Sequence, residues 1–215
     1  MGKKAVILGG GPIDSASVRL SLGEISIACD RGYRYFSSVG KEPDVFVGDF
    51  DTLPEKELGH PKMVLRLNPV KDDTDLGYAL KWALSEGYDT FWIYGGLGGR
   101  IDQTVANLQL LSFLKERGAE GFLVTPDGED VLFVRKAGER LSLRPEGKTR
   151  FSLFALSEEA TVSESGVFYP LDKATLSRRY PLGVSNELLE GKEGRVSVTE
   201  GEVLLEVPLS ALRKE

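Results

Sequence analysis

The first half of the chain alternates between short apolar runs and stretches in which apolar residues recur at helical spacing. Short apolar runs bounded by turn residues are typical of buried strands, whereas apolar residues three and four apart line one face of a helix. The expected strands are residues 4–9, 24–29, 45–48, 63–67, 90–94 and 122–125. The expected helices begin near Tyr33, at a cap formed by Asp73 or Thr74, and near Asp102. This alternation predicts an α/β domain with a mostly parallel sheet and flanking helices.

After residue 126 the pattern changes to strand-like runs separated by turn residues. These runs are residues 131–134, 141–143, 151–156, 161–167, 196–199 and 203–207. No long helical spacing interrupts them, which predicts an antiparallel, β-sandwich-like domain. We therefore expect two domains, residues 1–126 and 127–215, with the boundary inside residues 125–129.

Composition is that of a globular protein, because 41% of the 215 residues are hydrophobic and 28% are charged. The net charge of −6 argues against a broad nucleic-acid interface, which would need clustered lysines and arginines. The apolar runs are too short to span a bilayer, and the N-terminal one is too short for a signal peptide. The single cysteine, Cys29, cannot form an intrachain disulfide. We expect a cytoplasmic protein with neither nucleic-acid nor membrane partners.

Two aspartates follow the expected strand at residues 45–48. In an extended segment, residues two apart point to the same side, so Asp49 and Asp51 would face a common space. Like charges held that close repel each other unless a cation lies between them or one takes up a proton. The alternative is that both residues only belong to a turn, because Asp and Gly are common turn formers.

Further acids follow other expected strands, namely Asp30, Asp75 and Asp102. In a parallel sheet with right-handed crossovers, the ends of the strands lie along one edge. Several carboxylates on one edge favour a divalent cation, and Mg²⁺ prefers oxygen ligands and substrate phosphates. Lys71 and Arg100 supply the complementary cations for phosphate oxygens. Together these residues predict metal-assisted transfer of a phosphoryl-type group.

Two glycine-rich segments accompany the acids, at residues 9–11 and 95–99. Backbone N–H groups in such segments can come close to a phosphate. A tight strand-to-helix turn is the alternative for the first segment, and a plain loop is the alternative for the second. The first segment lacks the spacing of a dinucleotide fingerprint, and the chain lacks a Walker A motif.

Five short motifs occur in order along the chain. They are ACDRG at residues 28–32, GDFD at 48–51, KDDTD at 71–75, GGLGGRIDQTVAN at 95–107 and GVSN at 183–186. On these motifs and their order the chain resembles the thiamine pyrophosphokinase family across residues 30–186. The resemblance implies an α/β catalytic domain that binds ATP and Mg²⁺, a second domain that contributes to thiamine binding, and a homodimer with active sites at the interface. It also implies transfer of pyrophosphate from ATP to the hydroxyethyl group of thiamine, giving thiamine diphosphate and AMP.

The resemblance also implies a role for individual residues. Asp49, Asp51 and Asp75 would hold Mg²⁺ and orient the triphosphate, and Arg100 and Asp102 would complete the catalytic set. The residues that would support this site or contact ATP are Asp30, Lys71, Thr74, Gly98, Gly99 and Asn107. The residues that would meet the thiamine pyrimidine, from the partner subunit, are Ser185 and Asn186, with a plain β-turn as the alternative.

The sequence departs from the family pattern at three positions. Thr52 stands where serine is usual and keeps the hydroxyl, Gln103 replaces a usual histidine, and Arg31 stands where glycine is common. These departures bear on the identity of the substrate more than on the type of reaction. Two other functions stay open. One is a pyrophosphokinase of the same fold that acts on another hydroxymethyl substrate such as a pterin, and the other is a non-catalytic nucleotide or thiamine sensor. The aromatic candidates for contact with the thiamine ring, with core packing as the alternative, are Phe168, Tyr169 and Tyr180.

Overall fold

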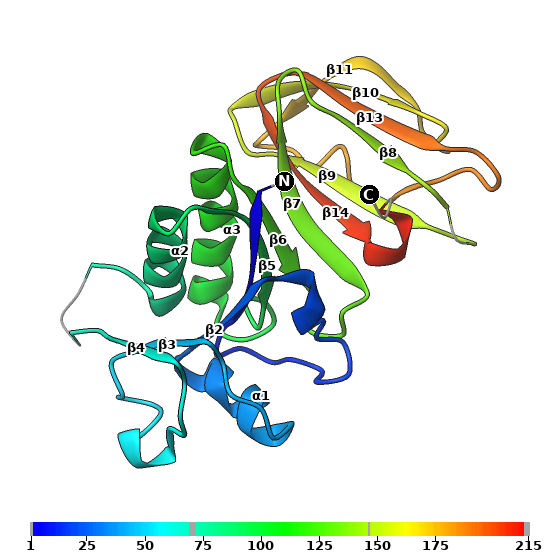
Figure 1. Ribbon diagram of the computed structural model, residues 1–215. Helices are drawn as coiled ribbons and strands as arrows, with labels where there is room; N and C mark the ends of the chain where they lie inside the picture. The colour runs from blue at the N-terminus through cyan, green and yellow to red at the C-terminus, as the bar shows by residue number, and fades with distance from the viewer. Residues whose placement is uncertain (1, 69–71, 146, 213–215) are drawn as a thin grey trace. The chain divides into compact units, whose positions relative to one another are not determined.

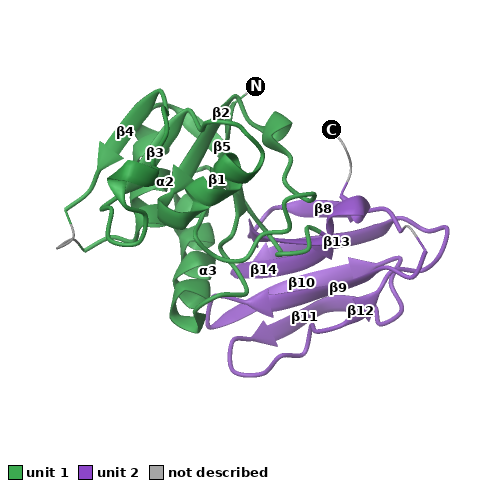
Figure 2. Cartoon of the chain, turned by 90° about the horizontal axis from the view of Figure 1, so that it is seen from below, with its two compact units in different colours: residues 1–128 green, residues 129–215 purple. Residues whose placement is uncertain are grey.

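The computed structural model describes residues 2–68, 72–145 and 147–212 of the chain. It contains two compact units, Met1–Gly128 and Glu129–Glu215 (Figure 2). The sequence pattern places the change of character after residue 126, two residues earlier. Lys71, which was expected to contact phosphate, lies outside the described residues.

A parallel sheet forms the centre of the first unit (Figure 1). Its strands are β1 (Lys3–Leu8), β2 (Ile25–Cys29), β3 (Val45–Gly48), β4 (Met63–Arg66), β5 (Tyr88–Tyr94) and β6 (Glu120–Val124). They are ordered β6-β5-β1-β2-β3-β4, and each neighbouring pair runs parallel. The last four side chains of β1 are fully buried, because a central parallel strand is covered on both faces.

Helices connect these strands as the apolar spacing predicts. They are α1 (Tyr33–Ser38), α2 (Asp75–Ser85) and α3 (Ile101–Glu116), with short 3₁₀ turns at Leu20–Leu22, Asp30–Gly32 and Glu55–Glu57. Helix α2 buries Leu76, Ala79, Leu80 and Ala83. Of the two expected caps, Thr74 is the one used, because its hydroxyl accepts a hydrogen bond of 3.0 Å from the backbone N–H of Gly77.

The second unit consists of antiparallel strands. They are β7 (Asp130–Lys136), β8 (Arg140–Leu143), β9 (Arg150–Ala155), β10 (Glu159–Ser165), β11 (Leu171–Ser177), β12 (Asn186–Glu187), β13 (Gly194–Glu200) and β14 (Glu202–Pro208), followed by a 3₁₀ turn at Leu209–Ala211. One sheet has the order β12-β9-β14-β7 and the other the order β11-β10-β13-β8. Val162, Val198, Leu205 and Phe133 are among their buried residues. The predicted fold class, α/β followed by an antiparallel sandwich, is confirmed.

Three local features differ from the sequence predictions or were missed by them. Strand β11 was not predicted, because only Leu176 of its seven residues is buried and no alternation of apolar residues marks it. Strand β12 has two residues, too few for any pattern. The glycines at residues 9–11 do not lead into a helix, since a turn and irregular structure occupy residues 12–19.

No helix in the part of the chain that the structure describes is long and apolar enough to cross a membrane. Cys29 is 2% exposed at the end of β2, and its thiol lies 3.8 Å from the carbonyl oxygen of Asp75. The cysteine is therefore a core residue that joins the end of β2 to the start of α2.

Candidate active site

The residues that follow the parallel strands emerge at one edge of the first unit. Gly9 follows β1, Asp30 follows β2, Asp49 follows β3, and Gly95 follows β5. The chain passes from β1 to β2 on one side, whereas β5 pairs with β1 on the other, so the strand order reverses between β1 and β5. Open α/β sheets bind ligands outside the carboxyl ends of their strands at such a point. This edge is therefore the candidate active site (Figure 1).

The two glycine segments contact each other at this edge. The N–H of Gly9 donates to the carbonyl of Tyr94 at 2.8 Å, and that of Gly11 donates to the carbonyl of Gly95 at 2.9 Å. A Cβ on Gly11 would lie 2.6 Å from the oxygen of Gly95, and Gly95 itself has φ of +67°. The glycines at positions 9 and 11 thus permit close packing of two loops. Their own N–H groups are used within the protein rather than left for a phosphate.

Asp30 lies beside the end of β3. A Cβ built on Gly48 would be 3.7 Å from the Cα of Asp30, so this aspartate adjoins the residue before Asp49. Its φ is +47°, a conformation that Asp adopts more readily than most residues. One carboxylate oxygen, Oδ2, accepts a hydrogen bond from the hydroxyl of Thr52. The other, Oδ1, is buried and has no hydrogen-bond partner among the described residues.

Asp49 and Asp51 stand on a turn and not on an extended segment. Phe50 between them has φ of +65°, and the N–H of Asp51 donates to Oδ1 of Asp49 at 3.1 Å. The prediction that this segment is extended, with both side chains on one side, is therefore wrong. The backbone forms the turn that was the alternative. The ring of Phe50 anchors this turn, because it packs 5.2 Å from the ring of Phe46 with the guanidinium of Arg66 4.3 Å from its centre.

Asp75 opens helix α2 and is held near the end of β2 through the Cys29 contact. An acid in the first turn of a helix is favourable in its own right, because the helix dipole is positive there. Asp73, in contrast, forms an ion pair of 2.7 Å with Lys81. Of the acids in the KDDTD motif, Asp75 is thus the one that the fold brings toward Asp30.

The described residues include no group of three or more acidic, histidine or cysteine side chains that could hold a metal ion. Mg²⁺ is commonly bound by one or two carboxylates together with waters and substrate phosphates, without an all-protein cage. The carboxylates at this edge fit that arrangement. The buried Oδ1 of Asp30, which has no hydrogen-bond partner among the described residues, is one oxygen that could take part in such a site.

Arg100 and Asp102 form a forked pair at the start of α3. Nε of Arg100 donates to Oδ1 of Asp102 at 3.1 Å, and Nη2 donates to Oδ2 at 2.5 Å. The hydrogen bonds from Arg100 lower the pKa of the Asp102 carboxyl, with help from the N–H of Gln103, and the same pair raises the pKa of Arg100. Both side chains remain exposed, by 75% and 62%. The guanidinium is thus fixed in direction and accessible to a ligand.

Asn107 supports the second glycine segment from within the unit. Its side chain is 6% exposed, and Nδ2 donates to the carbonyl of Gly96 at 2.8 Å. Gly98 and Gly99 are exposed. Of these three residues expected to contact ATP, the glycines are accessible, whereas Asn107 is placed to position the loop.

The GVSN motif in the second unit forms a turn with a strained backbone at Ser185 and a buried side chain at Asn186. Ser185 has φ of +60°, and its N–H donates to the hydroxyl of Ser152 at 3.2 Å. Asn186 is 6% exposed and hydrogen-bonded entirely within the protein. The aromatic candidates near this motif, Phe168, Tyr169 and Tyr180, are exposed, so core packing is wrong for them.

Glu164 is the buried acid beside Asn186, and sequence reasoning missed it. Its Oε2 accepts a hydrogen bond of 2.6 Å from Nδ2 of Asn186. The signal was present, because Ala160, Val162 and Glu164 alternate along one strand and therefore share its buried face.

Replacement of Thr52 tests whether its hydroxyl holds Asp30. Thr52→Val keeps the shape but removes the donor to Oδ2, and we expect it to lower the free energy of unfolding by about 1–3 kcal/mol. Thr52→Ser keeps the hydroxyl and should stay within about 0.5 kcal/mol of the native chain. Denaturant unfolding of the two variants measures the difference, and equal stability would refute the role.

Stability should depend on pH through Glu164. Burial raises the pKa of its carboxyl from 4.5 to about 7, against a smaller opposite effect of the Asn186 hydrogen bond. Between those values the folded chain keeps a proton that the unfolded chain releases, so stability falls as pH rises and levels off above pH 7. Glu164→Gln removes this titration. We expect it to be more stable than the native chain at pH 8 by on the order of 2–3 kcal/mol, and nearly equal at pH 4.5. Urea unfolding measures the free energy of unfolding of both chains at each pH. If it changes with pH in the same way for the native chain and for Glu164→Gln, this expectation is contradicted.

Comparison with known proteins gives the same picture for both units. The family model for the catalytic domain of thiamin pyrophosphokinase matches residues 20–123, and the model for its vitamin B1 binding domain matches residues 140–203. The chain is 29% identical over 184 residues to the thiamine pyrophosphokinase of Bacillus subtilis (strain 168), and the match covers 83% of this chain and 85% of that relative.

Solved structures agree with these matches. The crystal structure of the B. subtilis thiamine pyrophosphokinase has a TM-score of 0.80 at 27% identity, covering 96% of this chain and 99% of the other. That of thiamin pyrophosphokinase from Geobacillus thermodenitrificans has a TM-score of 0.79 at 29% identity, covering 97% and 100%.

Proposed function

The chain belongs to the thiamin pyrophosphokinase family, and we propose that the edge formed by Asp30, Asp49 and Asp75 is where it transfers pyrophosphate from ATP to thiamine. The observation that carries this proposal is the placement of Asp30 and Asp49 at the ends of the neighbouring parallel strands β2 and β3, next to the reversal of strand order. Asp75 joins them from the start of α2, which the Cys29 contact holds near the end of β2. The products of this transfer are thiamine diphosphate and AMP. The thiamine hydroxyl oxygen forms a bond to the β-phosphorus as the bond from that phosphorus to the AMP oxygen breaks, and the hydroxyl proton is released to solvent.

The charged residues of the edge have complementary roles in this proposal. Asp49, Asp51 and Asp75 would hold Mg²⁺, with Asp30 next to them. A bound Mg²⁺ supplies positive charge that neutralises the triphosphate. Arg100 presents its guanidinium to phosphate oxygens, and the fork with Asp102 fixes its direction. The remaining contacts proposed for ATP come from Lys71, Gly98 and Gly99, whereas Thr74 caps α2 and Asn107 holds the loop.

Thiamine binding is assigned to the second unit in this proposal. The hydroxyl of Ser185 would meet the pyrimidine, and Asn186 would act by holding the turn, because its own hydrogen bonds are used within the protein. Phe168, Tyr169 and Tyr180 are exposed by 61–69% and are available to a flat aromatic ring.

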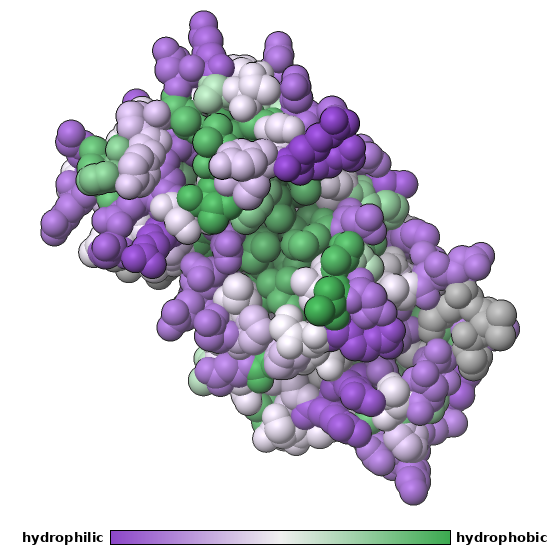
Figure 3. Space-filling model, turned by 180° about the vertical axis from the view of Figure 1, so that it is seen from behind, coloured by the Kyte–Doolittle hydropathy of each residue, from purple (hydrophilic) through white to green (hydrophobic). Residues whose placement is uncertain are grey.

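A homodimer with active sites at the interface is part of the proposal. Apolar residues gather on the face shown in Figure 3, with hydrophilic residues around them. In the second unit, Leu182 and Val184 are exposed directly before Ser185. Exposed apolar groups of this kind are typical of surfaces that associate. A cytoplasmic location also belongs to the proposal, supported by the single, buried cysteine.

The activity is tested by incubating the purified chain with ATP, Mg²⁺ and thiamine and measuring AMP. We expect AMP that depends on both thiamine and Mg²⁺. AMP formed with a hydroxymethyl pterin and not with thiamine would support the pterin alternative. A rise in melting temperature with ligand but without turnover would support a sensor. Formation of ADP alone would refute pyrophosphate transfer.

Mixing two inactive variants tests whether the site is shared between subunits. Asp51→Asn removes a charge in the first unit, and Ser185→Gly removes the hydroxyl in the second while keeping the positive φ without strain. If one site draws on both subunits, a mixed dimer has one site with both changes and one with neither. We therefore expect co-expressed variants to recover up to about half the native activity per mixed dimer. No recovery in dimers separated by affinity tags would place each site within one chain.

A further inference from the structure

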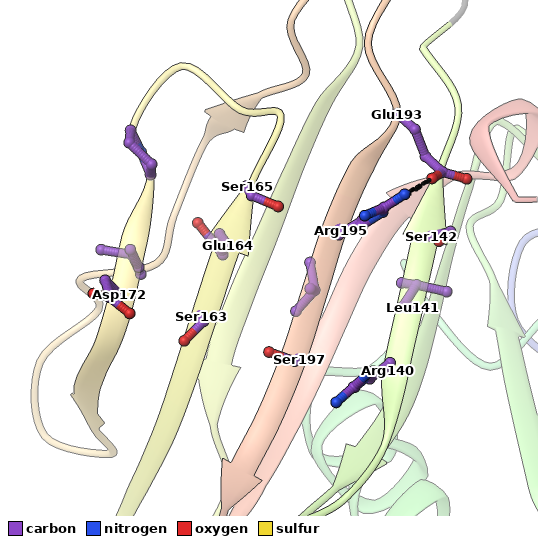
Figure 4. Close-up of a pocket in the computed structure, with 13 residues that line it drawn as sticks. Arg140, Leu141, Ser142, Ser163, Glu164, Ser165, Asp172, Glu193, Arg195 and Ser197 are labelled. Atoms are coloured by element: carbon purple, nitrogen blue, oxygen red, sulfur yellow. Dashed lines mark hydrogen bonds and ion pairs between the residues drawn. The ribbon is translucent and has the colours of Figure 1, made fainter.

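Glu164 occupies a position where an apolar residue would be expected. It lies on strand β10 next to Ser163 and Ser165, at the wall of a cavity of about 890 Å³ (Figure 4). The alternation of β10 places it on the same face as Ala160 and Val162, both almost fully buried. Glu164 itself is 4% exposed. Burial of a carboxyl group costs free energy unless the group is well paired, so an acid at this position requires an explanation.

Only one of the two carboxylate oxygens of Glu164 has a hydrogen-bond partner among the described residues, and that partner is Asn186. Its Oε2 accepts from Nδ2 of Asn186 at 2.6 Å. Its Oε1 is buried without a hydrogen-bond partner among the described residues. The pKa of the carboxyl is raised to about 7 by burial. The position therefore lowers stability at neutral pH. Among the described residues, the only side-chain hydrogen bond of Glu164 is the one with Asn186 of the GVSN motif.

Asn186 links two segments of the second unit through its amide group. Oδ1 accepts from the N–H of Tyr169 at 3.0 Å and from the N–H of Glu187 at 2.9 Å. Nδ2 donates to the carbonyl of Tyr169 at 2.9 Å as well as to Glu164. The N–H of Phe168 also donates to the carbonyl of Glu187 at 2.8 Å. The amide thus ties the exposed Phe168 and Tyr169 to the turn that carries Ser185.

Glu164 completes the hydrogen bonding of this amide. The backbone N–H groups of Tyr169 and Glu187 and the carbonyl of Tyr169 already select its orientation, because the rotated amide would set donor against donor and acceptor against acceptor. Nδ2 carries a second proton, and Oε2 of Glu164 accepts it. A side chain without an acceptor at position 164 would leave that buried N–H without its partner and so weaken the hold of the amide on the two segments.

We propose that Glu164 is a positioning residue for thiamine, which anchors the Asn186 amide through its second Nδ2 proton and so holds Ser185 and Tyr169 in the arrangement that receives the substrate. The inference rests on the proposed function, because it assigns the GVSN turn to thiamine. Glu164 does not touch substrate in this account. Its effect is confined to the affinity for thiamine, and the ATP edge in the first unit does not depend on it.

Variants at position 164 separate this role from a purely structural one. Glu164→Leu removes the acceptor, and we expect KM for thiamine and Kd for thiamine from calorimetry to rise about tenfold, with KM for ATP within about twofold of native. Glu164→Gln retains a carbonyl acceptor and should restore both thiamine constants. Glu159→Gln, at the exposed start of the same strand, is the matched control and should change neither.

Each outcome decides the inference. The inference is overturned if a folded Glu164→Leu variant keeps the native KM and Kd for thiamine. It is also overturned if KM for thiamine and KM for ATP rise equally. If the leucine variant does not fold, Glu164→Asp keeps the charge but shortens the reach, and a rise of several-fold in Kd for thiamine is expected there. Failure of the native chain to bind thiamine would overturn the proposed function together with this inference. If the native chain is active and the variants at position 164 bind thiamine as the native chain does, this inference alone is overturned.

Discussion

Asp51→Asn should reduce kcat by about a hundredfold or more while leaving the fold intact. The amide has nearly the shape of the carboxylate but carries no charge, so it weakens the attraction for Mg²⁺ and for the charge that develops during transfer. Asp49→Asn should have a similar effect. Its amide oxygen can still accept from the N–H of residue 51, so the turn around Phe50 is retained. AMP formation under saturating ATP and thiamine measures the loss.

The matched control is Glu57→Gln, which removes one exposed carboxylate from a 3₁₀ turn of the same unit. It should leave kcat within about twofold of native, because it lies outside the proposed site. Native turnover in either aspartate variant would contradict the metal assignment. Recovery of either variant with higher Mg²⁺ concentration would instead strengthen it, since weaker binding is overcome by mass action.

Arg100→Lys should lower kcat/KM for ATP by about tenfold to a hundredfold with little change in stability. Lysine keeps the positive charge but cannot reproduce the forked contact that fixes the guanidinium against Asp102. Because both partners are exposed, their ion pair contributes little to folding. Activity is therefore expected to fall without a matching fall in melting temperature.

Two companion variants complete this experiment. Asp102→Asn leaves the arginine in place but weakens its anchor, so its loss in kcat/KM for ATP should be smaller than that of Arg100→Lys. Arg117→Lys, at the other end of α3, is the matched control and should leave ATP kinetics unchanged. A large drop in melting temperature for Arg100→Lys, with kinetics unaffected, would show a structural role instead.

Much of the first unit could be predicted because its signals are local. The apolar runs mark the strands, and the spacing of Leu76, Ala79, Leu80 and Ala83 marks a helix whose cap the sequence narrows to Asp73 or Thr74. Parallel pairing then places Asp30 and Asp49 at one edge without further information. The order of the strands follows less directly, since it depends on which faces pack together.

The features that could not be predicted depend on contacts between distant residues. The hydroxyl of Thr52 donates a hydrogen bond to Asp30, which lies 22 residues earlier in the sequence, and no sequence pattern predicts such a pair. The positive φ of Phe50 is a conformation that non-glycine residues seldom adopt, so an extended segment was the natural expectation. Asn186 appears in the sequence as an exposed turn residue, and only the register of β12 against β9 shows that it is buried.

The packing of the two glycine segments has a consequence for how this enzyme can change over evolutionary time. Because Gly9, Gly11 and Gly95 approach one another through their backbones, a methyl group added to any of them meets the opposite loop. One loop cannot be altered while the other stays as it is, and a second substitution adds bulk where space is already lacking. This corner can therefore diverge only by remodelling both loops together. Gly98 is constrained as well, because its φ is +75° and a Cβ there would lie 2.9 Å from Cγ of Pro126, whereas a Cβ on Gly99 would meet nothing closer than 3.6 Å, so that position is freer to vary in sequence.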